Sequence, residues 1–294
     1  MTDRLPSIEV ALDDVRFRLR ETCSFDWLRA WGRAFAVFDQ QDSGNLGFGV
    51  ERDGRRYFVK FAGARPLDYG GDPADAVARL RAALPAYAAL RHPALANLVD
   101  HMAAGAGYAA LFEWFPGECL HTHWLYGGTA KYADPRSSNY RFARLPLEKR
   151  LRAYSRILEF HRHVEAQGYV AIDFYDGSVL YDFAVDEVRI CDVDFYARRP
   201  VTNTMGRMWG SSRFMSPEEF QLGAAIDERT MVYTMGATAF ALLGGERDRG
   251  RERWTAGEAL YCVACRAAAE DRTARYPSVA ALHDAWRVAL MPGT

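Results

Sequence analysis

Two glycines and a lysine near the start of the chain have the residue types of a phosphate-binding site. Gly44 and Gly47 lie in a polar, glycine-rich stretch, and Lys60 follows inside the apolar run 58–61. Glycines let a backbone approach phosphate closely and direct its N–H groups at the oxygens. A lysine in an apolar strand is costly to bury unless its ammonium meets a partner. The pattern indicates phosphate contacts, or else a simple hairpin turn followed by an edge-strand lysine that faces water.

Aspartates recur at two places in the middle of the chain. Asp173 and Asp176 follow a long helical pattern, with Ser178 two residues later, and Asp192 and Asp194 lie at the end of a short apolar run. Carboxylate oxygens are hard ligands of the kind that Mg²⁺ takes. Asp173 and Asp176 could instead cap a tight turn, a common role of Asp in loops. Their position between a long helix and two short strands favours a chemical role.

Segment 209–218 carries the most informative pattern in the chain, Trp-Gly-Ser-Ser-Arg-Phe-Met-Ser-Pro-Glu. This segment resembles the end of a protein-kinase activation segment. Residues 44–47, 58–61, 168–180 and 190–195 resemble, in the same order, the glycine-rich loop, the lysine strand, the catalytic loop and the metal-binding strand of that family. The chain thus resembles a divergent, bacterial-type member of the eukaryotic-type (Hanks-type) Ser/Thr protein kinases over roughly residues 34–287.

The resemblance implies an ATP-dependent phosphotransferase that uses Mg²⁺ or Mn²⁺. Asp173 falls at the position of the base that accepts the proton of the acceptor hydroxyl, and Lys60 at that of the lysine on the ATP phosphates. Asp192 matches the magnesium-binding aspartate. Ser178 falls on the second metal-binding position, which Asp176 offers as an alternative.

Two further assignments follow from the resemblance. ATP is expected between two lobes, with its adenine on backbone groups around Glu113 and Phe115. Arg275, in the stretch 271–278, is expected to form a buried structural ion pair with Glu218.

Several positions depart from the family pattern. Ala171 and Ile172 replace the usual His-Arg pair, and Tyr175 replaces a lysine. The glutamate that should pair with Lys60 falls near Ala83. Three hypotheses remain open: a protein Ser/Thr kinase, which we favour, a kinase of a small molecule such as an antibiotic or metabolite, and a nucleotide-binding pseudokinase or scaffold. The irregular stretch 120–144, rich in Tyr, His and Trp, could shape a small-molecule pocket.

Strand patterns precede helical ones, which predicts an α+β, two-lobed, kinase-like architecture. We expect a helical extension at 1–33, a lobe with a small antiparallel sheet at 34–115, and a larger helical lobe at 116–294. Pro85 should bend or divide a helix at 74–90. The expected strands are 34–38, 48–52, 55–62, 98–103, 108–115, 179–181 and 188–191, and the main expected helices are 147–167 and 231–243.

The composition limits which binding partners and which cellular compartment we expect. The net charge of −1 over 294 residues gives no overall reason to expect nucleic acid or an anionic membrane. No window is long and apolar enough for a membrane span. Five cysteines at irregular spacing favour a reducing, cytoplasmic location, and Cys262 and Cys265 are expected on a buried helix face rather than on zinc.

Overall fold

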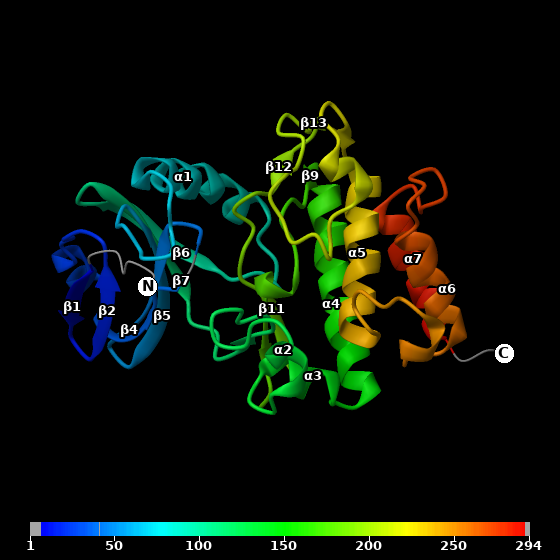
Figure 1. Ribbon diagram of the computed structural model, residues 1–294, viewed down its shortest axis with the longest axis horizontal. Coiled ribbons are helices and arrows are strands. Elements are labelled where there is room, and N and C mark those ends of the chain that lie inside the picture. The colour runs from blue at the N-terminus through cyan, green and yellow to red at the C-terminus, as the bar shows by residue number, and fades with distance from the viewer. Residues whose placement is uncertain (1–6, 41, 292–294) are drawn as a thin grey trace, which may run out of the picture. The chain divides into compact units, whose positions relative to one another are not determined.

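A computed structural model describes residues 7–40 and 42–291 of the chain. These residues divide into two compact units, each described here by itself and labelled by element in Figure 1. Unit 1 consists of the chain up to Ala88 together with Ala96–Pro116. Unit 2 consists of Ala89–Leu95 together with the chain from Gly117 onward.

Unit 1 is built on a five-stranded antiparallel sheet in the order β3-β4-β5-β7-β6. The turn between β4 and β5 is Asp53-Gly54, and both residues have positive φ, as a two-residue hairpin turn requires. Leu46, Phe48 and Val50 alternate along β4 and bury one face of the sheet. The strands are β3 (Arg33–Phe38), β4 (Asn45–Arg52), β5 (Arg55–Ala62), β6 (Leu98–Ala104) and β7 (Gly107–Glu113).

The N-terminal helical extension expected at 1–33 is wrong for the described residues from 7 onward. Strands β1 (Ile8–Leu12) and β2 (Val15–Leu19) form an antiparallel hairpin, followed by the 3-10 helix η1 (Asp26–Ala30). Val15, Phe17 and Leu19 are buried in alternation with exposed arginines, which is the period of a strand. These side chains join the same core as the buried face of β4. The first six residues lie outside the described part of the chain.

Helix α1 (Pro73–Ala89) contains Pro85 but is one continuous helix, so the expected division did not occur. Leu80, Ala83, Leu84 and Tyr87 are buried along it. This packing offsets the hydrogen bond that the proline cannot donate.

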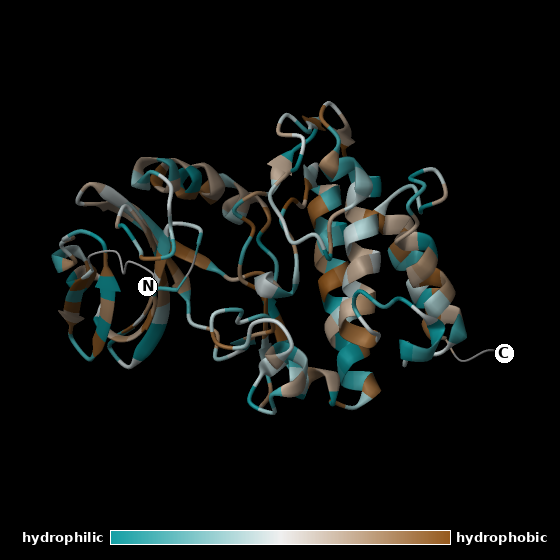
Figure 2. Cartoon of the chain, in the orientation of Figure 1, coloured by the Kyte–Doolittle hydropathy of each residue, from teal (hydrophilic) through white to brown (hydrophobic). Residues whose placement is uncertain are grey.

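Unit 2 is mostly helical. The long helices α4 (Leu147–Ala166) and α5 (Glu228–Leu243) contact each other, and Figure 2 shows hydrophobic residues along both. Nearly all of α5 is buried, as expected from its apolar composition. The shorter helices are α2 (Ala130–Ala133), α3 (Ser138–Ala143), α6 (Glu258–Ala267) and α7 (Val279–Leu290), and the 3-10 turns are η2 (Asp176–Ser178), η3 (Pro217–Phe220) and η4 (Arg251–Arg253).

Short antiparallel strands connect these helices. One small sheet has the order β11-β10-β8, and two pairs join β12 to β9 and β13 to β14. The strands are β8 (Glu118–Cys119), β9 (Tyr169–Val170), β10 (Val179–Asp182), β11 (Glu187–Ile190), β12 (Ala197–Arg198), β13 (Val201–Thr202) and β14 (Ala225–Ile226).

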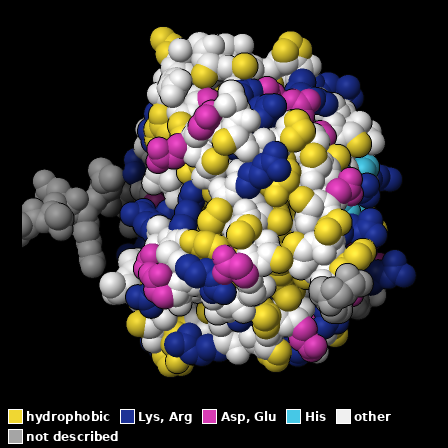
Figure 3. Space-filling view, turned by 90° about the vertical axis from the view of Figure 1, so that its right-hand side faces the viewer, with side chains coloured by type: hydrophobic (Ala, Val, Ile, Leu, Met, Phe, Trp, Pro, Cys, Tyr) yellow, Lys and Arg dark blue, Asp and Glu magenta, His cyan; other side chains and the backbone are white. Residues whose placement is uncertain are grey.

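The predicted α+β class is confirmed: the described residues form small antiparallel sheets and seven α-helices. None of those helices combines the length and the apolar character that crossing a membrane takes. The buried position expected for Cys262 and Cys265 is wrong, because both are exposed on α6. Figure 3 looks onto the α6–α7 side of unit 2, where hydrophobic side chains lie among basic and acidic ones.

Candidate functional site

Lys60 lies in β5, directly opposite Gly47 of β4 and Ala110 of β7. Its side chain is largely buried, with 8% of the residue exposed. Because cross-strand partners share a face, Lys60 and Gly47 project from the face of the sheet opposite the core of β1 and β2. The edge-strand alternative for Lys60 is wrong, since β5 pairs on both sides.

Aromatic rings cover the glycines of this region. A Cβ atom at Gly47 would lie 2.8 Å from the Phe58 ring, and one at Gly49 would lie 2.7 Å from the Phe35 ring. Gly44 has φ +81° and lies under Tyr69, whose ring would be 2.7 Å from such an atom. Ring packing and the positive φ therefore account for these glycines without a ligand. Phosphate contacts of Gly44 and Gly47 stay a prediction.

Helix α1 has no acid where the resemblance places the partner of Lys60. Ala83 is buried there with 2% of its surface exposed. The polar contact from α1 to the glycine loop comes instead from Arg79, which donates to the Ser43 carbonyl at 2.9 Å and to the Tyr69 hydroxyl at 3.2 Å. Arg79 thus holds the loop and the ring that covers Gly44.

The segment expected to contact adenine follows β7. The Glu113 N–H donates to the Asn97 carbonyl at 3.0 Å, and the Trp114 N–H donates to the Arg56 carbonyl at 3.3 Å. Those two donors are used within the sheet. The predicted adenine contacts of Glu113 and Phe115 would therefore have to come from the Glu113 carbonyl and from the backbone of Phe115.

In unit 2, the charges of Asp173 and Asp192 both act on one buried tyrosine. Burial raises the pKa of Tyr196 well above its ordinary value, and the negative charges of Asp192 and Asp173 raise it further. The Tyr196 hydroxyl is 2.8 Å from Nε2 of His161. Burial lowers the pKa of His161 to about 4, so this imidazole is neutral at pH 7.

Asp173 has φ +61°, a left-handed conformation that few residues other than glycine adopt. Backbone strain of this kind is concentrated at functional sites. A Cβ atom at Gly210 would lie 3.7 Å from the Cα of Asp173. Segment 209–218 therefore passes beside Asp173.

Asp192 follows β11, and its Oδ1 accepts a hydrogen bond from the Asp194 N–H at 3.0 Å. The Cys191 N–H donates to the carbonyl of Ser178 at 2.9 Å, so the backbone of Ser178 lies beside the residue that precedes Asp192. Ser178 is buried, with 1% of its surface exposed. Metal binding by Ser178 and Asp192 stays a prediction.

Asp176 does not fit the metal role that the sequence suggested. Its Oδ2 is 2.5 Å from Nζ of Lys131, and its Oδ1 accepts from Nη2 of Arg213 at 2.9 Å. Burial raises the pKa of Asp176, but the charges of Lys131 and Arg213 outweigh burial and hold that pKa below its ordinary value. Two cations already satisfy this carboxylate, so we assign it a structural role.

Glu246 completes a buried ion cluster with Lys131, Asp176 and Arg213. Lys131 Nζ lies 3.0 Å from Glu246 Oε1, Arg213 also pairs with Glu246, and the hydroxyl of Tyr132 donates to it. Burial lowers the pKa of Lys131 to about 8, and Asp176 opposes that shift. The cluster ties segment 209–218 to the loop that carries Asp173. The sequence reasoning missed Lys131 and Glu246, which lie 115 positions apart along the chain.

Glu218 and Arg275 form the ion pair that the sequence predicted. Arg275 donates from Nη1 to Glu218 Oε1 at 2.7 Å and from Nη2 to Oε2 at 3.1 Å. Thr230 donates to the same Oε1 at 3.0 Å. This bidentate pair fastens the end of segment 209–218 to helix α5 and the stretch before α7.

Glu219, beside this pair, should give the fold a pH dependence. Burial raises its pKa to about 7, although the Ser216 N–H and hydroxyl favour the carboxylate. An acid with a raised folded-state pKa contributes stability that is full below its unfolded pKa and is lost as pH rises through the folded value. We expect the contribution of Glu219 to the unfolding free energy to fall by up to about 3 kcal/mol between pH 5 and 8, on the basis of about 1.36 kcal/mol per pKa unit. The buried His161, whose pKa is lowered, contributes in the opposite direction over the lower part of this range.

Urea unfolding at several pH values measures this dependence. The difference in unfolding free energy between the wild type and Glu219→Gln should fall over that range. The difference between the wild type and Glu252→Gln, a substitution on the exposed turn η4, should stay constant. A difference between the wild type and Glu219→Gln that does not change with pH would contradict the raised pKa of Glu219.

No group of three or more His, Cys, Asp or Glu side chains in residues 7–40 and 42–291 is arranged to hold a metal ion. A site that combined Asp192 and Ser178 with oxygens of a ligand would contain fewer than three such side chains. Comparison with known proteins adds no family: no protein-family model matches the chain. A search of curated proteins also found no match.

Proposed function

We propose that the chain is an ATP-dependent phosphotransferase of the protein-kinase-like class, acting on hydroxyl groups and most directly on protein Ser or Thr. The observation that supports it best is that segment 209–218 passes beside Asp173 at Gly210, while Ser178 is bonded to the residue before Asp192. Asp173 and Asp192 are thereby given two different roles, as phosphoryl transfer requires.

Asp173 is assigned as the base that accepts the hydroxyl proton of the acceptor. It has a left-handed backbone conformation and lies beside segment 209–218, which suits contact with an acceptor hydroxyl. Lys60 of unit 1 is assigned to the ATP phosphates, because a buried ammonium is a suitable partner for anionic oxygen.

Mg²⁺ fits this assignment through Asp192 with Ser178 beside it. An aspartate carboxylate is a hard oxygen ligand, and Mg²⁺ completes its shell with water and phosphate oxygens. When bound, the ion neutralises the charge of the phosphates. Asp176 is excluded from this set because Lys131 and Arg213 hold both of its oxygens. We place the activity in the cytoplasm, where ATP is supplied.

The contacts of two segments favour a protein acceptor over a small molecule. Lys131 and Tyr132, in the stretch expected to shape a small-molecule pocket, are engaged in the buried ion cluster. Segment 209–218, by contrast, is anchored at Arg213 and Glu218 and leaves Trp209 with 53% of its surface exposed. An anchored segment with an exposed aromatic residue is suited to contact an extended polypeptide.

A nucleotide-binding pseudokinase is the second candidate, favoured by the aromatic rings over Gly44, Gly47 and Gly49. Those rings restrict the approach of phosphate to the backbone of β4. Turnover separates the two candidates, since a pseudokinase binds nucleotide without hydrolysis or transfer.

Nucleotide binding is the first test. We expect ATP or ADP with Mg²⁺ to raise the thermal midpoint, because ligand at one hundred times its Kd adds about 2.7 kcal/mol to folding stability. Asp192→Asn should abolish the Mg²⁺-dependent part of the shift, since the amide lacks the charge that holds the ion. Asp284→Asn, on the exposed face of α7, should behave like the wild type. No shift at millimolar nucleotide would rule out the phosphotransferase.

A further inference from the structure

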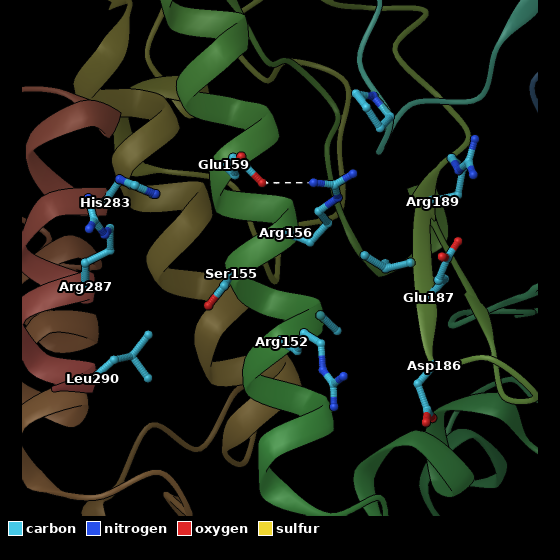
Figure 4. Close-up of a pocket in the computed structure, with 13 residues that line it drawn as sticks. Arg152, Ser155, Arg156, Glu159, Asp186, Glu187, Arg189, His283, Arg287 and Leu290 are labelled. Atoms are coloured by element: carbon cyan, nitrogen blue, oxygen red, sulfur yellow. Dashed lines mark hydrogen bonds and ion pairs between the residues drawn. The ribbon is translucent and has the colours of Figure 1, made fainter. Parts of the chain in front are cut away.

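Unit 2 contains a cavity of about 650 Å³ away from all of the residues discussed above (Figure 4). Its floor is the exposed side of α4, which carries Arg152, Ser155, Arg156 and Glu159, and its walls come from α7 and β11. The opposite side of α4 is buried in the helical core. We call this cavity the α4 groove.

Four arginines line the α4 groove, against three carboxylates. One carboxylate, Glu159, accepts from Arg156 at 3.1 Å, and another, Asp186, pairs with Lys149 from outside the lining at 2.6 Å. Arg152 on α4 and Arg287 on α7 are both exposed. Within the described ranges 7–40 and 42–291, neither takes part in a hydrogen bond or ion pair. The groove thus has two guanidinium groups available for an anionic ligand.

Apolar side chains lie among these charges. Val188 and Leu290 are part of the lining, and Leu290 has 39% of its surface exposed. Leu290 thus offers a partner an apolar contact next to the charged groups.

We propose that the α4 groove binds an acidic, extended segment of a partner protein. Carboxylates of the segment would meet the guanidinium groups of Arg152 and Arg287, whose planar donors match a carboxylate in two-point contact. An aliphatic side chain of the segment would pack on Leu290. This inference is independent of the phosphotransferase proposal.

The carboxylates of the groove distinguish this partner from nucleic acid. A phosphodiester backbone presents evenly spaced negative charge, which Glu187 and the net charge of the whole chain would repel. A peptide can place its acids opposite the arginines and neutral or apolar residues opposite Glu187.

Fluorescence anisotropy with the full chain tests the proposal. The probe is a fluorescein-labelled peptide of Glu, Leu and Gly, and the comparison peptides carry Gln or Lys in place of every Glu. We expect the Glu peptide alone to bind, more weakly as salt is raised. The double variant Arg152→Ala/Arg287→Ala should weaken binding about tenfold or more, as expected for loss of charge-assisted hydrogen bonds.

The matched control is Arg251→Ala/Arg253→Ala, two exposed arginines on η4. It should bind the Glu peptide like the wild type. Equal binding of the Gln peptide, or equal weakening in the control, would overturn the proposal. Tighter binding of a labelled single-stranded RNA, lost in the groove variant, would overturn it in favour of nucleic acid. Thermal melting of each variant verifies that the fold is retained.

Discussion

Asp173→Asn is expected to lower phosphoryl transfer by about a hundredfold to ten-thousandfold, the range for loss of a general base, while ATP affinity stays nearly unchanged. Asparagine has the size of aspartate and tolerates a left-handed backbone, so φ +61° can be kept. Its amide cannot accept the proton of an acceptor hydroxyl. Because the assigned partner of Asp173 is the acceptor and not the nucleotide, binding of ATP should survive.

Single-turnover transfer from labelled ATP, read as autophosphorylation and ATP hydrolysis, measures the chemical step. Nucleotide affinity is measured in parallel by thermal shift. The matched control is Asp53→Asn, which makes the same substitution at φ +53° in the exposed turn between β4 and β5. Full turnover in Asp173→Asn would contradict the assignment of the base. Loss of ATP binding in this variant would show that Asp173 acts on the nucleotide instead.

Local patterns predicted the elements whose own residues determine their structure. The strand at 55–62 was predicted with its observed bounds, because a hairpin turn precedes it and paired strands bury both of its sides. The helix predicted at 147–167 matches α4, because its apolar residues recur on one face. The Glu218–Arg275 pair was predicted from family resemblance alone, since the two residues are 57 positions apart.

The N-terminal error has a physical cause. Phe25, Leu28 and Trp31 have helical spacing and are buried, but only η1 is helical there. In the stretch before them, Val15, Phe17 and Leu19 alternate with arginines, which is the pattern of a strand. These three side chains pack against the buried face of β4, and that contact stabilises the strand. A hairpin of two short strands needs such a partner surface, and the sequence of the hairpin does not reveal it.

The candidate site, like the fold, could be predicted only where local sequence patterns determine the structure. The positions of Asp173 and Asp192 along the chain could be predicted because each follows a recognisable helix or strand, whereas their chemical roles stay a prediction from family resemblance. The surroundings of Asp176 could not be predicted, because its partners come from α2 and from segment 209–218. The rings over Gly47 and Gly49 come from neighbouring strands, and only strand register reveals that pairing.

Lys131→Met is expected to destabilise the fold by about 3–5 kcal/mol, the cost of leaving buried charge without its partner. Lys131 and Arg213 together balance Asp176 and Glu246, and all four side chains are at most 9% exposed. Methionine keeps most of the side-chain volume, so the loss is electrostatic rather than a cavity. Two buried carboxylates would then share one guanidinium group.

Urea unfolding, followed by circular dichroism, measures the loss. Lys149→Met is the matched control, because its pair with Asp186 is partly exposed and should contribute about 1 kcal/mol or less. Adding Glu246→Gln to Lys131→Met removes one of the uncompensated charges and should recover part of the stability. A loss in Lys131→Met no larger than in Lys149→Met would contradict a buried, balanced cluster. Because Arg213 of the same cluster anchors segment 209–218 beside Asp173, Lys131→Met should also lower phosphoryl transfer under conditions where the variant remains folded.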